Sequence, residues 1–157
     1  MNTIEIQHFR GALFALLDET FDHVQGYYLD RGTSLFETLA GISAAEASIP
    51  VGGKCATLAA QVKHVAFYLD VYERSVRDAD FSGADWGEIW RTVSAVTKEE
   101  WQAIQTELQD NYNSILKLVE ETSTWSSEDE IGEVMAVVVH TAYHLGEIRQ
   151  ALCTLKS

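Results

Sequence analysis

The fold is decided most clearly by residues 97–119, TKEEWQAIQTELQDNYNSILKLV. Thr97 is followed three positions later by Glu100, which is the capping-box signature of a helix N-terminus. Apolar residues then recur at spacings of three and four, which is the period of one helix face. They are Trp101, Ile104, Leu108, Tyr112, Ile115 and Val119. The stretch therefore predicts a long amphipathic helix.

The same helical period recurs in three other parts of the chain. We expect long helices from about residue 3 to 26, from 56 to 77, and from 128 to 154. The last begins at Ser127-Glu128-Asp129-Glu130, a second capping signature. Four long helices in one chain of this size predict an all-α fold, a four-helix bundle that forms a single domain over residues 1–157.

The connections between these helices are expected to be long. We predict a short helix at residues 34–39, and a helical turn within residues 79–96. At Pro50-Val51-Gly52-Gly53 the fixed φ of proline and the freedom of glycine predict a chain reversal. Gly52-Gly53-Lys54 is no phosphate-binding loop, because Ser48 and Cys55 stand where that motif needs glycine and a hydroxyl.

Composition excludes some partners. The 157 residues carry a formal net charge of -13, which argues against a nucleic-acid partner because phosphates repel an acidic surface. There is no apolar run near the roughly 20 residues of a membrane span. Residues 1–10 do not resemble a signal peptide, so we expect a cytoplasmic protein. Cys55 and Cys153 are expected to be free and at least half-buried.

The strongest chemical signal is His140-Thr141-Ala142-Tyr143-His144. Two histidines four apart share one helix face, with their Cβ atoms roughly 5–6 Å apart, so both imidazoles can reach one metal ion. The alternative is a chance pair of surface histidines. The apolar run at residues 134–139 argues against a chance pair at the surface, because such a run predicts a segment buried on most sides. A buried histidine needs a partner, since an unsatisfied polar group costs roughly 1–3 kcal/mol.

His64 is the candidate third ligand. On a helical projection of residues 56–77 the charged residues share one sector, and His64 falls outside it, beside Ala60, Phe67 and Val71. A lone inward histidine is more often a satisfied core residue. Two inward histidine positions on different helices favour a shared metal site on His64, His140 and His144.

Other candidates carry weaker signals. Glu147 follows His144 by three residues, and could be a partner of an imidazole, a fourth ligand or a catalytic base, or simply a paired or solvated carboxylate. His8 is expected to be exposed, and His23 has a small chance of touching the site. Tyr68 and Tyr143 could line it, although aromatic residues on such helices are usually core.

The chain resembles the DinB/YfiT-like superfamily, and the resemblance covers nearly the whole chain. Its specific part is the closing stretch HTAYHLGEIRQ at residues 140–150. Two looser parts are GGKCATL at 52–58 followed by QVKH at 61–64, and Trp90 followed by VTKEEW at 96–101. Many relatives have His-Arg-Gly-Gln where this chain has His144-Leu145-Gly146-Glu147, which puts any role of that Arg and Gln in doubt.

The resemblance implies a four-helix bundle with a metal held by His64, His140 and His144. The metal in relatives is commonly zinc or nickel, sometimes iron. Some relatives activate a low-molecular-weight thiol such as bacillithiol or mycothiol, others form the iron-binding part of a sulfoxide synthase, and many have no established activity. Family members often form dimers, so a homodimer is expected.

Two functional hypotheses follow. The first is a metal-dependent hydrolase or thiol S-transferase, in which the divalent ion activates a water or a thiol and Glu147 is catalytic. The sequence shows no cationic pocket for an anionic thiol, which weakens the transferase version. The second is a non-catalytic, metal-stabilised stress-response protein, in which the ion holds two helices together.

Overall fold

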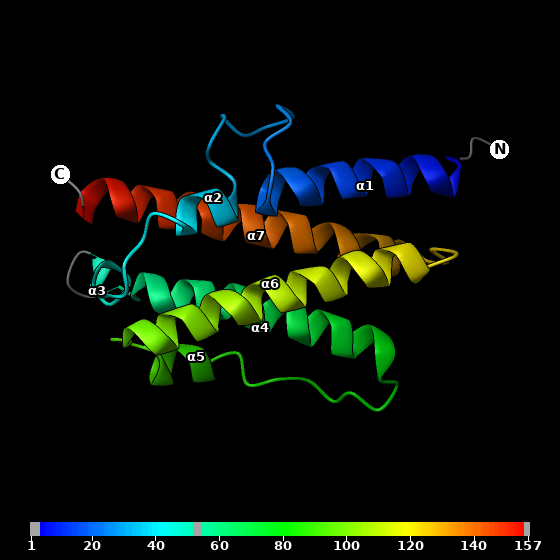
Figure 1. Ribbon diagram of the computed structural model, residues 1–157. Coiled ribbons are helices and arrows are strands. Elements are labelled where there is room, and N and C mark those ends of the chain that lie inside the picture. Colours follow the sequence, from blue (N-terminus) through cyan, green and yellow to red (C-terminus); the bar gives the residue numbers. More distant parts are fainter. Residues whose placement is uncertain (1–3, 52–54, 156–157) are drawn as a thin grey trace.

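The computed structural model describes residues 4–51 and 55–155, and every regular element in these ranges is a helix. The described residues form four long helices and three short ones, which are labelled in Figure 1. The long helices are α1 (Ile6–Phe21), α4 (Leu58–Arg77), α6 (Lys98–Glu121) and α7 (Glu128–Leu155). The short ones are α2 (Leu35–Leu39), α3 (Ala44–Ala47) and α5 (Glu88–Thr92).

The long helices pack side by side. Helix α4 contacts α6 and α7, and α1 contacts the same two helices from the other side. In Figure 1 α1 and α7 run in one direction, and α4 and α6 run in the opposite direction. Because α4 and α6 are parallel, the chain between them must return along their whole length. The segment 78–97, which includes α5, makes this return beside α4.

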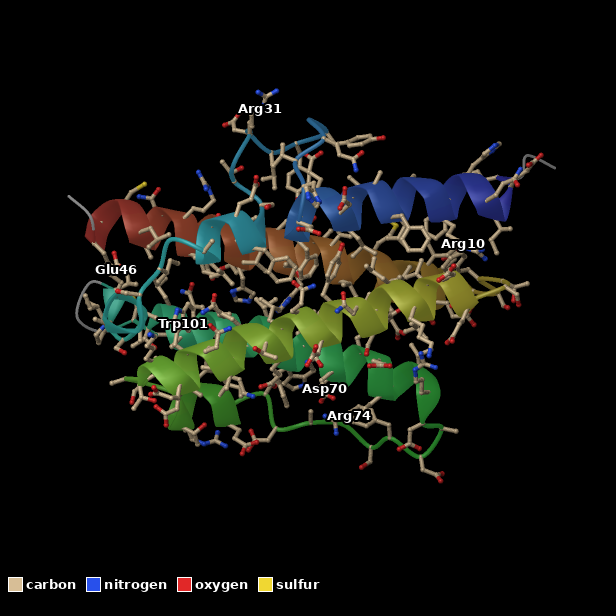
Figure 2. All side chains as sticks on the ribbon, in the orientation of Figure 1. Arg10, Arg31, Glu46, Asp70, Arg74 and Trp101 are labelled. Carbon is tan, nitrogen blue, oxygen red and sulfur yellow. The ribbon has the colours of Figure 1, made fainter. Side chains whose placement is uncertain are left out.

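One cluster of buried apolar side chains joins all four long helices. The stripe predicted on α6 is buried along its whole length, from Trp101 to Val119. Trp101 also donates a hydrogen bond from its indole N–H to the carbonyl of Ile42, 2.8 Å away, which ties α6 to the chain before α3. Figure 2 shows Trp101 on the first turns of α6. No helix of the described residues has the length and apolar character needed to cross a membrane.

The predicted helix ends were confirmed for α6 and largely for α7. Thr97 and Glu100 form the reciprocal capping box of α6. At α7 the hydroxyl of Ser127 accepts the N–H of Glu130 at 3.1 Å, whereas the Glu130 carboxylate accepts the N–H of Ser126 instead of that of Ser127. The signal at residue 127 therefore marked the correct start, with a different second hydrogen bond.

The first helix was predicted too long. It begins at Ile6 and ends at Phe21, short of the expected residue 26. Beyond this end the chain folds back over Glu19, a fully buried carboxylate of α1. This carboxylate accepts four backbone N–H groups at 2.6–3.2 Å, those of Gln25, Tyr27, Tyr28 and Leu29. Burial raises the pKa of Glu19, but these hydrogen bonds outweigh burial and lower the pKa, so the carboxylate stays charged.

Two further predictions concern the chain reversal at Pro50 and the burial of the two cysteines. Pro50 and Thr57 form an isolated antiparallel bridge, so the chain does reverse between them, although Gly52, Gly53 and Lys54 of the predicted turn lie outside the described residues. Both cysteines are free as expected, but Cys55 and Cys153 are exposed, not half-buried. Cys153 lies in the last turns of α7, on a side of that helix that faces away from the core.

Candidate metal centre

The three predicted histidines come together between α4 and α7. These two helices are antiparallel and in contact, which brings His64 opposite His140 and His144 although 76 residues separate His64 from His140. One potential ligand atom from each ring lies within 4.8 Å of the other two. The Nε2 atoms of His64 and His140 are 3.2 Å apart. The set could therefore hold one metal ion.

The imidazoles are largely shielded from water. His64 is 8% exposed and His144 is 7% exposed, while His140 is partly buried. Burial, and then the neighbouring histidines, lower the pKa of His140 to about 4. Burial and His144 likewise lower the pKa of His64 to about 4, against an opposing effect of Glu147. Burial also lowers the pKa of His144, again opposed by Glu147. At neutral pH the rings are uncharged, which is the form that binds metals.

The hydrogen bonding of these rings fits a cation. The Nδ1 atoms of His64 and His140 are buried and have no hydrogen-bond partner. Their Nε2 atoms face each other, so without an ion only one proton can be shared between the two rings. Each buried polar group that is left without a hydrogen-bond partner destabilises the folded protein by roughly 1–3 kcal/mol. Neutral rings that carry their protons on Nδ1 would turn both Nε2 lone pairs toward a divalent ion, so the residues present fit such a group, although the two Nδ1–H groups would still lack a partner among the described residues.

His144 differs because its second nitrogen is occupied. Its Nδ1 lies 2.8 Å from Oε2 of Glu147, one turn further along α7. An acceptor at Nδ1 holds the proton there and leaves the Nε2 lone pair free for a metal, which is the usual outer partner of a metal-binding histidine. Of the roles considered for Glu147, this contact fits that of a hydrogen-bond partner of the His144 imidazole.

Aromatic rings surround the three histidines. Tyr68 stacks on His140, with ring centroids 3.8 Å apart and planes inclined by 15°. Trp90 lies 4.6 Å from His64 between ring centroids, and Trp86 lies 6.4 Å from it. Tyr143 packs its ring edge against His144 at 5.1 Å. The sequence pointed to Tyr68 and Tyr143 by position, but not to the two tryptophans as lining residues. The occurrence of two tryptophans in one connection was the only sequence feature that could have indicated that this segment lines the site.

One sequence argument for the site was wrong. The run at residues 134–139 is not buried on most sides, because Met135 is 48% exposed and Val139 is 65% exposed. Only Val134, Val137 and Val138 of this run are buried. Helix α7 lies on the surface of the assembly of helices, so one of its faces remains open even where the residues are apolar.

The remaining histidines lie elsewhere. His8 is exposed on α1, as expected. His23 follows the end of α1 and is exposed, with Nδ1 3.4 Å from Asp18 and 3.3 Å from Asp22. His23, Asp18 and Asp22 form a separate acidic group at the surface, so His23 does not belong to the three-histidine site.

Comparison of the chain with protein-family models, with curated proteins and with solved structures finds no match. The functional interpretation therefore rests on the geometry of the site and on the sequence motif at residues 140–150.

Proposed function

We propose that this protein is a metal-dependent enzyme in which His64, His140 and His144 hold one divalent ion that activates a water or a low-molecular-weight thiol. The observation that carries the proposal is the convergence of three uncharged, shielded imidazoles from two helices on one point. Three protein ligands with further positions open is the usual composition of a catalytic zinc site, whereas structural sites are closed by a fourth ligand.

Each residue has a definable task in this proposal. His64, His140 and His144 donate neutral nitrogens, so the full double charge of a bound ion would remain available to lower the pKa of a water or thiol. Glu147 fixes the ring of His144 through Nδ1. The same carboxylate is partly exposed and could accept a proton from a reacting group. Tyr68 fixes the plane of His140 by stacking.

We further propose that the four long helices form a four-helix bundle of the DinB/YfiT-like type. Support comes from the motif at residues 140–150 and from the mutual packing of α1, α4, α6 and α7. On the same resemblance the metal is zinc or nickel, with iron as a third candidate. A small molecule is the expected substrate, and a homodimer is the expected state. The exposed apolar side chains Met135, Val139 and Tyr143 on α7 are consistent with an interface there.

The metal site is tested by equilibrium dialysis of tag-free protein against zinc, nickel and ferrous iron at micromolar concentration, followed by elemental analysis. One ion per chain is expected. His64→Ala, His140→Ala and His144→Ala should each lose the ion, and His8→Ala, an exposed histidine on α1, is the matched control. Uptake of no metal by the wild type, or unchanged uptake by the three variants, would remove the basis of the proposal.

The enzymatic part needs a separate test. The loaded protein is assayed for conjugation of small thiols to an electrophile and for ester hydrolysis, in parallel with His144→Ala. Metal-dependent turnover supports the enzyme. If the protein binds metal without turnover, and chelation lowers its melting temperature, the second hypothesis is favoured: a non-catalytic protein that the ion stabilises by mass action between α4 and α7.

A further inference from the structure

Two tryptophans cover the outer side of the three-histidine site. Trp86 and Trp90 come from the return segment 78–97, and both lie against His64. Trp86 also contacts Phe67 and Tyr68, with ring centroids 5.6 and 6.0 Å apart. The two tryptophans are nevertheless 44% and 42% exposed. Each indole therefore has one part against His64 and another part open to solvent, where it can contact a ligand.

Three cations on α4 and on the return segment are already engaged. Lys63, next to His64, binds the carboxylate of Glu107 on α6 at 2.6 Å. Arg91, next to Trp90, is paired with Asp85. Arg74 is paired with Asp70 at 2.7 Å and lies over the ring of Phe81, and Figure 2 shows both Arg74 and Asp70 on α4. None of these three side chains is free to bind an anion at the site.

Carboxylates flank the site instead. Glu147 adjoins His144 directly. Glu133 lies two turns before His140 on α7 and raises the pKa of Tyr68, the residue stacked on His140, in addition to the effect of burial. At neutral pH, where the imidazoles are uncharged, the charged groups that act on His64, His144 and Tyr68 are these two glutamates. With a chain charge of -13, the field around the metal-free site attracts cations.

We propose that the ligand admitted to this site is an organic cation, an amine or alkylated ammonium compound, whose charged group is held on the exposed parts of Trp86 and Trp90. Indole faces attract cations through their quadrupole, and tryptophan does so best among the aromatic residues. The indoles also separate that group from the ion at the histidines. This inference names the substrate class and thereby rests on the proposed function for its biological meaning, but the cation site itself consists of residues outside the metal-binding set.

The probe is choline, compared with 3,3-dimethyl-1-butanol, its uncharged counterpart of nearly the same shape. Binding of each is measured by isothermal titration calorimetry and by tryptophan fluorescence, on metal-free and on zinc-loaded protein. We expect choline to bind at least about tenfold more tightly than the alcohol, corresponding to roughly 1.4 kcal/mol and within the range of a cation held by more than one ring. Equal affinity for the two compounds, or no binding of choline, would overturn the inference.

Variants locate the effect. Trp86→Leu and Trp90→Leu should each reduce the preference for choline to less than about threefold, since each removes one indole face. Trp125→Leu is the matched control, because Trp125 packs against Phe9 at the far end of the helices. Glu133→Gln removes only a charge from an exposed side chain, and should weaken choline binding about two- to threefold without affecting the alcohol. A preference that persists in both tryptophan variants contradicts the assignment.

The outcomes separate the two proposals. Zinc uptake is measured on the same samples by dialysis. Zinc binding without a preference for choline overturns the organic-cation inference and leaves the metal site intact. A preference for choline without zinc uptake overturns the proposed metal enzyme, while the cation site remains supported by its own titration.

Discussion

At the scale of single residues, Glu147 decides how well His144 is prepared for a metal. Its carboxylate lies 2.8 Å from Nδ1 and selects the tautomer with a free Nε2. We expect Glu147→Gln to lower zinc affinity about tenfold, the lower end of the effect of losing such an outer partner. Glu120→Gln on α6, an exposed glutamate, removes the same charge and should leave zinc affinity unchanged. Affinities are compared by competition with a zinc-binding dye, and equal affinities in Glu147→Gln and wild type would contradict this role.

Individual residues also mark where sequence reasoning succeeded or failed. The pair His140 and His144 was predictable because helical spacing alone places both rings on one face. Glu19 was not predictable, since an acidic residue beside an apolar stripe ordinarily lies at the surface. Its burial is compensated by the four backbone N–H groups of the chain that follows α1, and these form only when that chain folds back.

At the scale of elements, substitution by alanine should change the stability of the protein in opposite directions at two glycines, one within α1 and one after its end. Gly11 lies on the exposed side of α1, and an added Cβ there meets no atom within 4 Å. Gly11→Ala should therefore stabilise the protein by about 0.5–1 kcal/mol, because alanine loses less backbone entropy in a helix. Gly26 has φ +93°, so Gly26→Ala should destabilise the protein by about 1–2 kcal/mol.

Urea unfolding followed by circular dichroism measures both changes. Neither glycine is near His64, His140 or His144 in the sequence, so zinc uptake serves as a check that the variants fold correctly. Changes of the same sign in the two variants would show that the end of α1 is not held in the conformation described.

At the scale of the whole molecule, the shielded histidines make the metal-free protein sensitive to acid. The pKa of His64 and that of His140 fall from 6.5 to about 4 on folding. Between these values the unfolded chain binds protons that the folded protein does not, so stability is full above pH 6.5 and declines as the pH falls towards 4. Each histidine can lower the free energy of unfolding by at most about 1.4 kcal/mol per pH unit.

The measurement is urea unfolding of metal-free protein at a series of pH values between 7.5 and 4.5. A double variant, His64→Phe with His140→Phe, lacks both titrating rings but keeps every carboxylate, so it reports the acid sensitivity that has other causes. The wild type should lose stability more steeply than the variant over this range. Parallel curves would mean that the two imidazoles are accessible to protons in the folded protein.

The sequence by itself determined the four long helices and the buried face of α6, and it singled out the three histidines. These features depend on contacts between residues three or four apart and on capping side chains, and such local interactions are readable from spacing. For the same reason the sector argument placed His64 inward on α4 without knowledge of the partner helix.

Only the tertiary structure decided what faces His64. The antiparallel contact of α4 with α7 joins residues 76 apart, and the parallel course of α4 and α6 forces the return segment to cross the site with Trp86 and Trp90. Neither follows from a local rule, because the path of a long connection is set by the side chains on which it packs. The stretch at residues 97–119 thus predicted a helical protein, whereas the pairing of helices assembled the candidate metal site beside two indoles.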